Sequence, residues 1–177
     1  MTVFLTLPAF NEAEALPLLL GAFCAEMEKC GATGRVVIVD DGSVDETVRV
    51  IRQWSGRVPI ELVRHEKNLG LGETIRDGLR RAAELAAPDD AIVTMDADNT
   101  HSPSQIPRML ALIAEGHDVV IASRYRPGSR VVGLGPFRVL MSHGARVLFQ
   151  LCLPIPGVRD YTCGFRAYRA SVIQKAW

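Results

Sequence analysis

Short apolar segments that favour strands alternate four times with amphipathic segments that favour helices, and this alternation restricts the fold more than any other feature of the sequence. The apolar segments are rich in β-branched residues, and they predict strands at Thr2–Leu7, Val36–Val39, Ile60–Val63, Ala91–Met95 and Val119–Ala122. Because these segments are continuous apolar runs, both faces of the sheet are expected to be covered by helices. The sequence therefore predicts an α/β fold with a doubly wound, mostly parallel sheet.

Helices are expected in the amphipathic segments, and cap residues predict where several of them begin. The first helix is predicted to begin at a capping box of Asn11 and Glu14 or else at Pro17, and the second at a capping box of Ser43 and Glu46. The third is predicted to run from Glu73 to Ala87. The fourth is predicted to begin at Ser102 and Pro103 and to end at Gly116. A further helical candidate spans Phe137–Leu153.

The composition is that of an ordinary soluble domain. The 177 residues fit one domain, and 48% of them are hydrophobic and 23% charged. The formal net charge is zero, so overall charge indicates no nucleic-acid partner. No cationic leader followed by an apolar stretch opens the chain, and there is no run of about 18 uncharged apolar residues. Neither a signal peptide nor a membrane span is predicted, and a cytoplasmic location is expected.

Polar residues cluster directly after four of the predicted strands. They are Pro8, Asn11 and Glu12 after the first, residues 40–43 after the second, Asp96, Asp98 and Asn99 after the fourth, and Ser123, Arg124 and Tyr125 after the fifth. Ligands bind at the carboxyl ends of the strands in sheets of this kind, so these loops are expected to share one rim. A rim with so many carboxylates needs a cation to neutralise it.

The sharpest feature of this rim is the pair Asp96 and Asp98, which stand two residues apart. Two such carboxylates can hold one hard divalent cation, Mg²⁺ or Mn²⁺, that also binds phosphate oxygens of a substrate. The cation would offset the charge on a departing diphosphate. Alternatively, the two aspartates only cap the following helix; Ser102 already fills that position, which favours the metal site.

Two more motifs border the rim. In the turn at 40–43, Asp-Asp-Gly-Ser, one aspartate can hold the loop while the other accepts hydrogen bonds from a base or ribose; the alternative is a capped turn without a ligand. The loop at 68–72, Asn-Leu-Gly-Leu-Gly, either brings backbone amides near a phosphate or is shaped by glycine for structural reasons alone.

An acid-free stretch follows the fifth strand. Residues 119–158 contain no Asp or Glu but hold Arg124, Arg126, Arg130, Arg138 and Arg146. Guanidinium groups suit phosphate oxygens, and the position of Arg124 directly after a strand favours that role over a solvated basic face. The candidate helix Phe137–Leu153 either lies on a membrane surface or packs on the sheet, and the sequence leaves both interpretations open.

The four histidines show no ligand spacing. His101 lies beside the Asp96 loop and can support the metal ligands from behind. His65, His117 and His143 are assigned to the surface or to packing.

Several motifs recur in a known order along nearly the whole chain. They are Pro-Ala-Phe-Asn-Glu at 8–12, the turn at 40–43, the loop at 68–72, Asp-Ala-Asp at 96–98 followed by His-Ser-Pro at 101–103, Ser-Arg-Tyr at 123–125, and Asp-Tyr-Thr-Cys-Gly-Phe-Arg-Ala-Tyr at 160–168. Together they resemble inverting family-two glycosyltransferases, and within these the dolichyl- and polyprenyl-phosphate mannosyltransferases.

The resemblance implies a GT-A fold, a nucleotide-sugar donor and a set of site residues. It implies donor contacts from Pro8, Phe10, Glu12, Val39 and Asp41, diphosphate and metal contacts from Asp96, Ala97 and Asp98 with Thr100 beside the metal, and phosphate contacts from Arg124 and Arg138. Phe10 departs from the usual tyrosine, so a hydroxyl contact is lost, and Thr100 stands where some relatives have glutamine or serine. The chain ends at Trp177, so residues 1–177 are expected to form a single GT-A domain without the C-terminal part found in relatives.

The predicted reaction transfers a hexosyl group, with mannose favoured, from a nucleotide sugar, with GDP-mannose favoured, to a polyprenyl or dolichyl phosphate with inversion. Asp98, Arg124, Arg138 and Asp160 are the expected catalytic residues. Because the acceptor phosphate is already anionic, Asp160 acts either as a base or as a group that orients the acceptor. Such an acceptor implies a peripheral position on the cytoplasmic face of a membrane.

Two other functions fit parts of the sequence. Residues 96–100 match the D-x-D-x-T of haloacid-dehalogenase-like phosphatases, but that chemistry needs a downstream lysine and an acidic pair. Only Lys175 follows Thr100 and no acidic pair follows, so this function is rejected. The other alternative is a domain that binds a nucleotide sugar without turnover.

Overall fold

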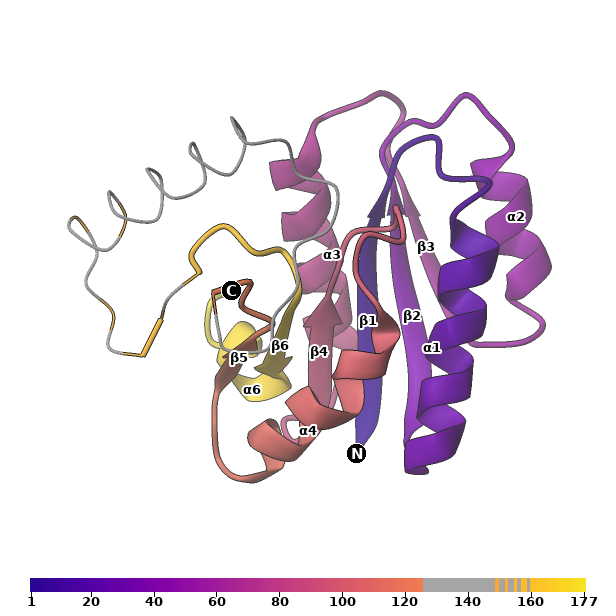
Figure 1. Cartoon of the computed structure of the whole chain (residues 1–177). Helices are drawn as coiled ribbons and strands as arrows, with labels where there is room; N and C mark the ends of the chain where they lie inside the picture. The colour runs from indigo at the N-terminus through magenta and orange to yellow at the C-terminus, as the bar shows by residue number, and fades with distance from the viewer. Residues whose placement is uncertain (126–148, 150–151, 153–154, 156, 159) are drawn as a thin grey trace.

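The computed structural model describes residues 1–125, 149, 152, 155, 157–158 and 160–177, and within these residues six strands form one sheet (Figure 1). The strands are β1 (Thr2–Ala9), β2 (Thr33–Asp40), β3 (Ile60–Arg64), β4 (Ala91–Thr94), β5 (Val119–Ile121) and β6 (Arg166–Arg169). Their order across the sheet is β3-β2-β1-β4-β6-β5. All five predicted strands are therefore present, and one further strand was not predicted.

The first four strands pair in parallel, as their continuous apolar runs predict. The unpredicted strand β6 lies between β4 and β5 and is antiparallel to both. Its sequence, Arg-Ala-Tyr-Arg, contains no apolar run that would mark a strand. Because Arg166 pairs with Thr94, the segment that precedes β6 lies at the carboxyl end of β4. Residues 160–165 are thereby added to the edge of the sheet where ligands are expected.

Helices cover both faces of the sheet and produce three layers (Figure 1). They are α1 (Leu16–Cys30), α2 (Thr47–Trp54), α3 (Leu71–Leu85), the 3₁₀ helix η1 (Pro103–Gln105), α4 (Ile106–Ala114) and α6 (Ala170–Gln174). Successive residues of β1 point to opposite faces: Val3 and Leu5 pack with α1 and α4, whereas Phe4 packs with α3 and α6. The predicted doubly wound α/β fold is confirmed.

The two capping boxes predicted for α1 and α2 are wrong, and Asn11 and Ser43 make other hydrogen bonds instead. Neither α1 nor α2 has a side-chain cap, and α1 instead carries Pro17 in its first turn. Asn11 Oδ1 accepts a hydrogen bond from Val44 N at 3.0 Å, and Ser43 Oγ accepts one from Asn11 N at 2.9 Å. The loops after β1 and β2 are thereby tied together at the carboxyl edge of the sheet.

The predicted start of the fourth helix is confirmed. Ser102 Oγ accepts a hydrogen bond from Ser104 N at 3.3 Å, Pro103 opens η1, and η1 leads directly into α4. Gly116, with a φ of 107°, follows the end of α4. The helical candidate Phe137–Leu153 lies outside the described residues apart from positions 149 and 152. Among the described helices, none is both long and apolar enough to cross a membrane.

Candidate functional site

A cavity of about 320 Å³ opens at the carboxyl ends of β1, β2 and β4. Most of the residues predicted to bind a donor line it, namely Pro8, Phe10, Glu12, Asp41, Asp96, Ala97 and Asp98. Asn68, Gly70, Leu71 and Thr74 also line it. Val39 and Arg124 are not among the lining residues, and the Val39 side chain is fully buried within β2. Three of the four loops expected to share a rim therefore border one cavity, and the loop after β5 does not line it.

Besides Asp41, the carboxylates of Glu12, Asp96 and Asp98 bring negative charge to this cavity. Burial raises the pKa of Asp96, and the neighbouring Asp98 raises it further, against a lowering effect of His101. Burial also raises the pKa of Glu12, and Asp98, Asp45 and Asp96 add to that effect. Burial is the largest cause of both shifts, and repulsion by neighbouring carboxylates adds to it. The cavity is therefore suited to a bound cation.

The Asp96 loop has the oxygen donors that Mg²⁺ or Mn²⁺ requires. Within the described residues, no group of three or more His, Cys, Asp or Glu side chains can hold a metal by itself. Two carboxylates are sufficient for an ion that completes its shell with water and substrate phosphates. Thr100 donates its hydroxyl to Asp98 Oδ1 at 2.7 Å and its N–H to the same oxygen at 3.0 Å. Thr100 thus orients Asp98, and its role as a ligand stays a prediction.

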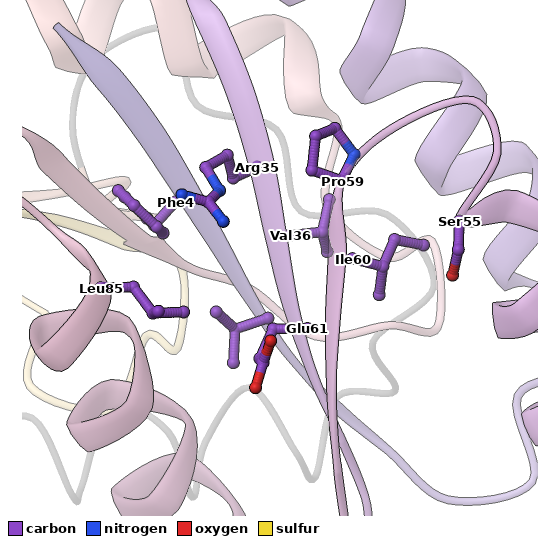
Figure 2. A pocket seen from close by; sticks show the side chains of 9 residues that line it. Phe4, Arg35, Val36, Ser55, Pro59, Ile60, Glu61 and Leu85 are labelled. Carbon is purple, nitrogen blue, oxygen red and sulfur yellow. The ribbon is translucent and has the colours of Figure 1, made fainter.

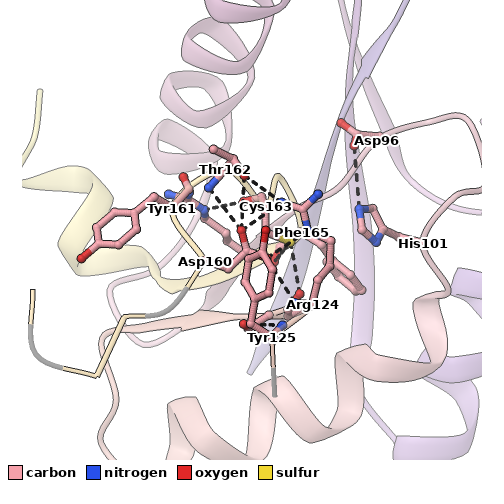
Figure 3. Close-up of polar contacts among 12 residues, drawn as sticks. Asp96, His101, Arg124, Tyr125, Asp160, Tyr161, Thr162, Cys163 and Phe165 are labelled. Carbon is pink, nitrogen blue, oxygen red and sulfur yellow. Dashed lines mark hydrogen bonds and ion pairs between the residues drawn. The ribbon is translucent and has the colours of Figure 1, made fainter. Parts of the chain in front are cut away.

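Asp96 is bordered by His101, five residues further along the chain (Figure 3), and by the distant segment that precedes β6. His101 Nε2 lies 3.9 Å from Asp96 Oδ2, and the His101 ring packs against Phe165 with 5.4 Å between the ring centroids. A Cβ at Gly164 would lie 3.4 Å from Asp96 Oδ1. The segment that precedes β6 therefore reaches the carboxylate closely, and His101 lies beside Asp96 as the sequence predicts.

The two aspartates of the turn after β2 hold different loops. Asp40 is fully buried; its Oδ1 accepts from Ser43 N at 3.2 Å, and its Oδ2 lies 3.2 Å from Arg64 Nε. Asp41 reaches further, because its Oδ1 and Oδ2 accept the N–H groups of Leu69 and Gly70 at 2.8 and 2.9 Å. Holding a loop was expected of one aspartate, and both of them do so. Only Asp41 also lines the cavity.

The amides of the glycine-rich loop are consequently turned toward Asp41. Gly42, with a φ of 77°, allows this close packing, since a Cβ there would lie 2.7 Å from the carbonyl carbon of Lys67. The Leu69 and Gly70 amides donate to Asp41 and not toward a phosphate site. For these two residues, the structure therefore supports the interpretation in which glycine shapes the loop for structural reasons.

His65 is a site residue that the sequence did not reveal. It is 8% exposed, its Nδ1 lies 2.7 Å from Asp41 Oδ1, and its Nε2 lies 3.2 Å from Asp77 Oδ2. Burial alone would lower the pKa of His65, but the hydrogen bonds and charges of the two carboxylates raise it above its ordinary value. Burial alone would raise the pKa of Asp41, but His65 and the two loop amides lower it. The only sequence signal was the position of His65 just before the glycine-rich loop.

A second polar cluster joins Arg124 to Asp160 (Figure 3). The Arg124 guanidinium donates to both oxygens of Asp160 at 3.0 Å, and Arg124 N donates at 3.1 Å. Arg124 Nη2 also donates to Thr162 Oγ1 at 2.7 Å. Burial of Asp160 would raise its pKa, but these contacts with Arg124 lower it. An ionised carboxylate held in this way is suited to orienting Arg124, and the phosphate contact predicted for Arg138 lies outside the described residues.

Another cavity, of about 200 Å³, lies at the amino ends of β2 and β3 (Figure 2). Its charged groups are engaged: the Arg35 guanidinium lies 5.4 Å from the Phe4 ring centroid, and Glu61 Oε1 accepts from Arg81 Nη2 at 2.7 Å. This cavity is at the opposite end of the strands from Asp96 and is not part of the candidate site.

A mostly parallel sheet with an Asp-x-Asp loop and a cavity at its carboxyl edge defines the class of GT-A glycosyltransferases. The model of the family described as Glycosyl transferase family 2 matches residues 5–177. The chain belongs to this family.

Two curated relatives have about one third of their aligned residues in common with the chain. The dolichol-phosphate mannosyltransferase of Pyrococcus furiosus is 33% identical over 175 residues, which are 98% of this chain and 48% of the relative. The polyprenol monophosphomannose synthase of Mycolicibacterium smegmatis is 32% identical over 178 residues, which are 96% of this chain and 62% of the relative. The chain thus spans about half to three fifths of the length of these two relatives.

Solved structures confirm the GT-A fold. The chain superimposes on glucosyl-3-phosphoglycerate synthase from Mycobacterium tuberculosis, in complex with Mn²⁺, uridine diphosphate and phosphoglyceric acid, with a TM-score of 0.68 and 22% identity, covering 97% of this chain and 56% of that one. The mannosyltransferase PcManGT from Pyrobaculum calidifontis, in complex with GDP-Man and Mn²⁺, gives a TM-score of 0.61 and 20% identity, covering 98% and 46%.

Proposed function

We propose that this chain is the catalytic domain of an inverting, divalent-metal-dependent enzyme that transfers mannose from GDP-mannose to a polyprenyl or dolichyl phosphate. The observation that carries the proposal is the cavity at the carboxyl edge, which is lined both by the carboxylates of Glu12, Asp96 and Asp98 and by the loop that Asp41 holds. Such a space fits an anionic donor only together with a cation. The names of the two curated relatives support mannose as the sugar and a lipid phosphate as the acceptor.

The donor is proposed to lie between the loop after β1 and the Asp41 turn. A carboxylate has about four acceptor positions, and Asp41 uses three of them for His65, Leu69 and Gly70. The remaining position on Oδ2 is available to a base or ribose in the cavity. Phe10, which is 45% exposed, provides apolar surface next to it.

Asp96 and Asp98 are proposed to hold the metal, with Thr100 keeping Asp98 in position. When bound, Mg²⁺ or Mn²⁺ would stabilise the negative charge of the departing diphosphate. Gly164 leaves room beside Asp96 that a side chain would occupy. Both carboxylates belong to one short loop directly after β4, so a single strand end positions the whole ligand set.

On the acceptor side, one oxygen of the lipid phosphate attacks the anomeric carbon while the bond from that carbon to the diphosphate breaks, which inverts the configuration. The acceptor oxygen is already anionic, so no strong general base is required. We assign Asp160 the orienting role, because it is held ionised by Arg124, and we assign phosphate binding to Arg124 and Arg138. A lipid acceptor also supports a peripheral position on the cytoplasmic face of a membrane.

The test has two stages. Thermal unfolding is first measured with GDP-mannose, other GDP-sugars and UDP-sugars, each with and without Mn²⁺, because a ligand that binds the folded state raises the melting temperature. Release of GDP and formation of mannosyl phospholipid are then measured with polyprenyl phosphate in liposomes. Binding of GDP-mannose without transfer would identify a domain that binds a nucleotide sugar without turnover. Hydrolysis of a generic phosphoester instead would favour the phosphatase alternative.

A further inference from the structure

His65 connects three elements, β2, β3 and α3, and of these the end of β2 and the start of α3 contribute residues to the cavity lining. It follows β3, its Nδ1 contacts Asp41 at the end of β2, and its Nε2 contacts Asp77 on α3. The distances are 2.7 and 3.2 Å, and the imidazole is almost completely buried. His65 does not itself line the cavity. Any effect on a bound donor must therefore pass through the residues that it holds.

The residue through which His65 acts is Asp41. Asp41 Oδ1 accepts from both His65 and Leu69 N, while Oδ2 accepts from Gly70 N. The loop that these two amides belong to forms one wall of the cavity. If Asp41 lost the hydrogen bond from His65, the carboxylate would be free to rotate, and both loop amides would lose a fixed acceptor.

The protonation state of His65 decides how many of its two contacts are hydrogen bonds. Each ring nitrogen of His65 faces a carboxylate oxygen, so both contacts are hydrogen bonds only when the ring carries both protons. Arg80 and Arg76 place nitrogens 3.3 and 3.5 Å from Asp77 Oδ1, and Arg76 also pairs with Glu73. On the other side, Arg64, the residue before His65, pairs with Asp40. Arg80 and Arg76 partly neutralise Asp77 from the α3 side, whereas Asp41 depends on His65 for its cationic partner.

We propose that His65 is a positioning residue of the donor pocket, which, in its doubly protonated form, links Asp77 to Asp41 and so holds the loop at 68–70 in the shape that receives the nucleotide. This inference rests on the proposed function, since it concerns the affinity of the same pocket for its donor. It assigns to His65 a part in donor binding without direct contact with the donor.

Two amide variants separate the two contacts of the ring. The amide nitrogen of His65→Asn takes approximately the place of Nδ1 and keeps a donor for Asp41. That of His65→Gln takes approximately the place of Nε2 and keeps a donor for Asp77 only. His65→Gln is expected to raise the dissociation constant for GDP-mannose roughly tenfold, as expected for the loss of a charge-assisted hydrogen bond, and His65→Asn by no more than about threefold. His117→Gln, at an exposed histidine, is the matched control.

The pH dependence is a second readout that a packing role would not produce. A nucleotide sugar has no ionisation of its diphosphate near neutral pH, so GDP-mannose is a suitable probe between about pH 6 and about pH 9. The wild-type affinity is expected to fall a few-fold as pH rises through the pKa of His65, because the neutral ring can donate to only one carboxylate. Neither amide variant is expected to show this step. In turnover, His65→Gln should raise the KM for the donor while kcat changes little.

Hydrogen exchange of the Leu69 and Gly70 amides, measured without any ligand, makes the outcomes distinguishable. Faster exchange and weaker binding in His65→Gln, with smaller changes in His65→Asn, would support the inference. Equal affinities of the wild type and both variants, with unchanged exchange, would overturn it and leave the proposed function standing. If the wild type binds no nucleotide sugar, the proposed function fails, and with it the role in donor binding; exchange still decides whether His65 holds the loop.

Discussion

Two sets of carboxylates border the same edge of the sheet, and their surroundings are opposite. Asp41 and Asp160 each have a cationic side chain as a partner, His65 and Arg124 respectively, and each also accepts backbone N–H groups. Their pKa values are lowered despite burial. In the other set, burial and mutual repulsion raise the pKa values of Glu12 and Asp96.

The difference indicates which carboxylates stabilise the fold and which are suited to binding a ligand. A compensated carboxylate stabilises the folded state and fixes the loop or arginine that it contacts. A group of carboxylates that repel one another destabilises the folded state until a cation binds. Substitutions in the two sets, and at His65 beside Asp41, test this distinction.

The largest effect is expected for Asp98→Ala. It should reduce Mn²⁺-dependent binding of GDP by about 100-fold or more, because only one carboxylate of the pair then remains for the metal. Calorimetry with and without Mn²⁺ measures this effect, and Asp89→Ala, at an exposed aspartate just before the amino end of β4, serves as the control. If Asp98→Ala kept the Mn²⁺ dependence of the wild type, the metal site would be wrongly placed.

Asp41→Ala should have the next largest effect. It should weaken binding of GDP-mannose and of free GDP by a similar factor, because Asp41 is assigned to the nucleoside and not to the sugar. Loss of a hydrogen bond to a charged group costs about 1.5–3 kcal/mol, or roughly 10- to 150-fold in affinity. Titrations of both ligands against the same protein decide the question: a loss confined to the sugar-bearing donor contradicts the assignment.

Neutralising a carboxylate of each set should change the free energy of unfolding differently. Asp160→Asn should lower the free energy of unfolding by about 2–3 kcal/mol, because Arg124 loses its ionised partner in a partly buried place. Asp96→Asn should leave stability unchanged or raise it by about 0.5–1 kcal/mol, because it removes a repelled charge. Urea denaturation without metal measures both variants. Equal destabilisation by the two substitutions would remove the distinction between the sets.

The smallest expected effect is a pH dependence of stability. The folded-state pKa of His65 is raised, so its contribution is fully present below about pH 6.5, its unfolded value, and is lost as pH rises through the folded pKa. The folded-state pKa of Asp41 is lowered, so its contribution is lost as pH falls through that value. The difference in free energy of unfolding between wild type and His65→Asn should therefore be about 1 kcal/mol near pH 6 and shrink at alkaline pH. A difference that does not vary with pH would mean that His65 acts by packing alone.

The sequence predicted the central half of the fold well because that information is local. Each parallel strand is a continuous apolar run, and the residues directly after it must lie at the carboxyl edge. This placed Glu12, Asp41, Asp96 and Asp98 around one cavity without knowledge of any long-range contact. The capping boxes failed for the converse reason: Asn11 and Ser43 found partners in each other's loops, 32 residues apart, instead of in their own helices.

Local sequence patterns were sufficient to specify the α/β alternation, the parallel pairing of β1 to β4 and the acidic loop that follows β4. Tertiary structure alone decided that β6 enters the sheet between β4 and β5, because its four residues carry no apolar pattern and its position depends on hydrogen bonding to both neighbours. That insertion brings Asp160 to Arg124, 36 residues away. Tertiary structure also placed His65 between Asp41 and Asp77, because a histidine acquires its charge and its partners only from the elements that fold around it.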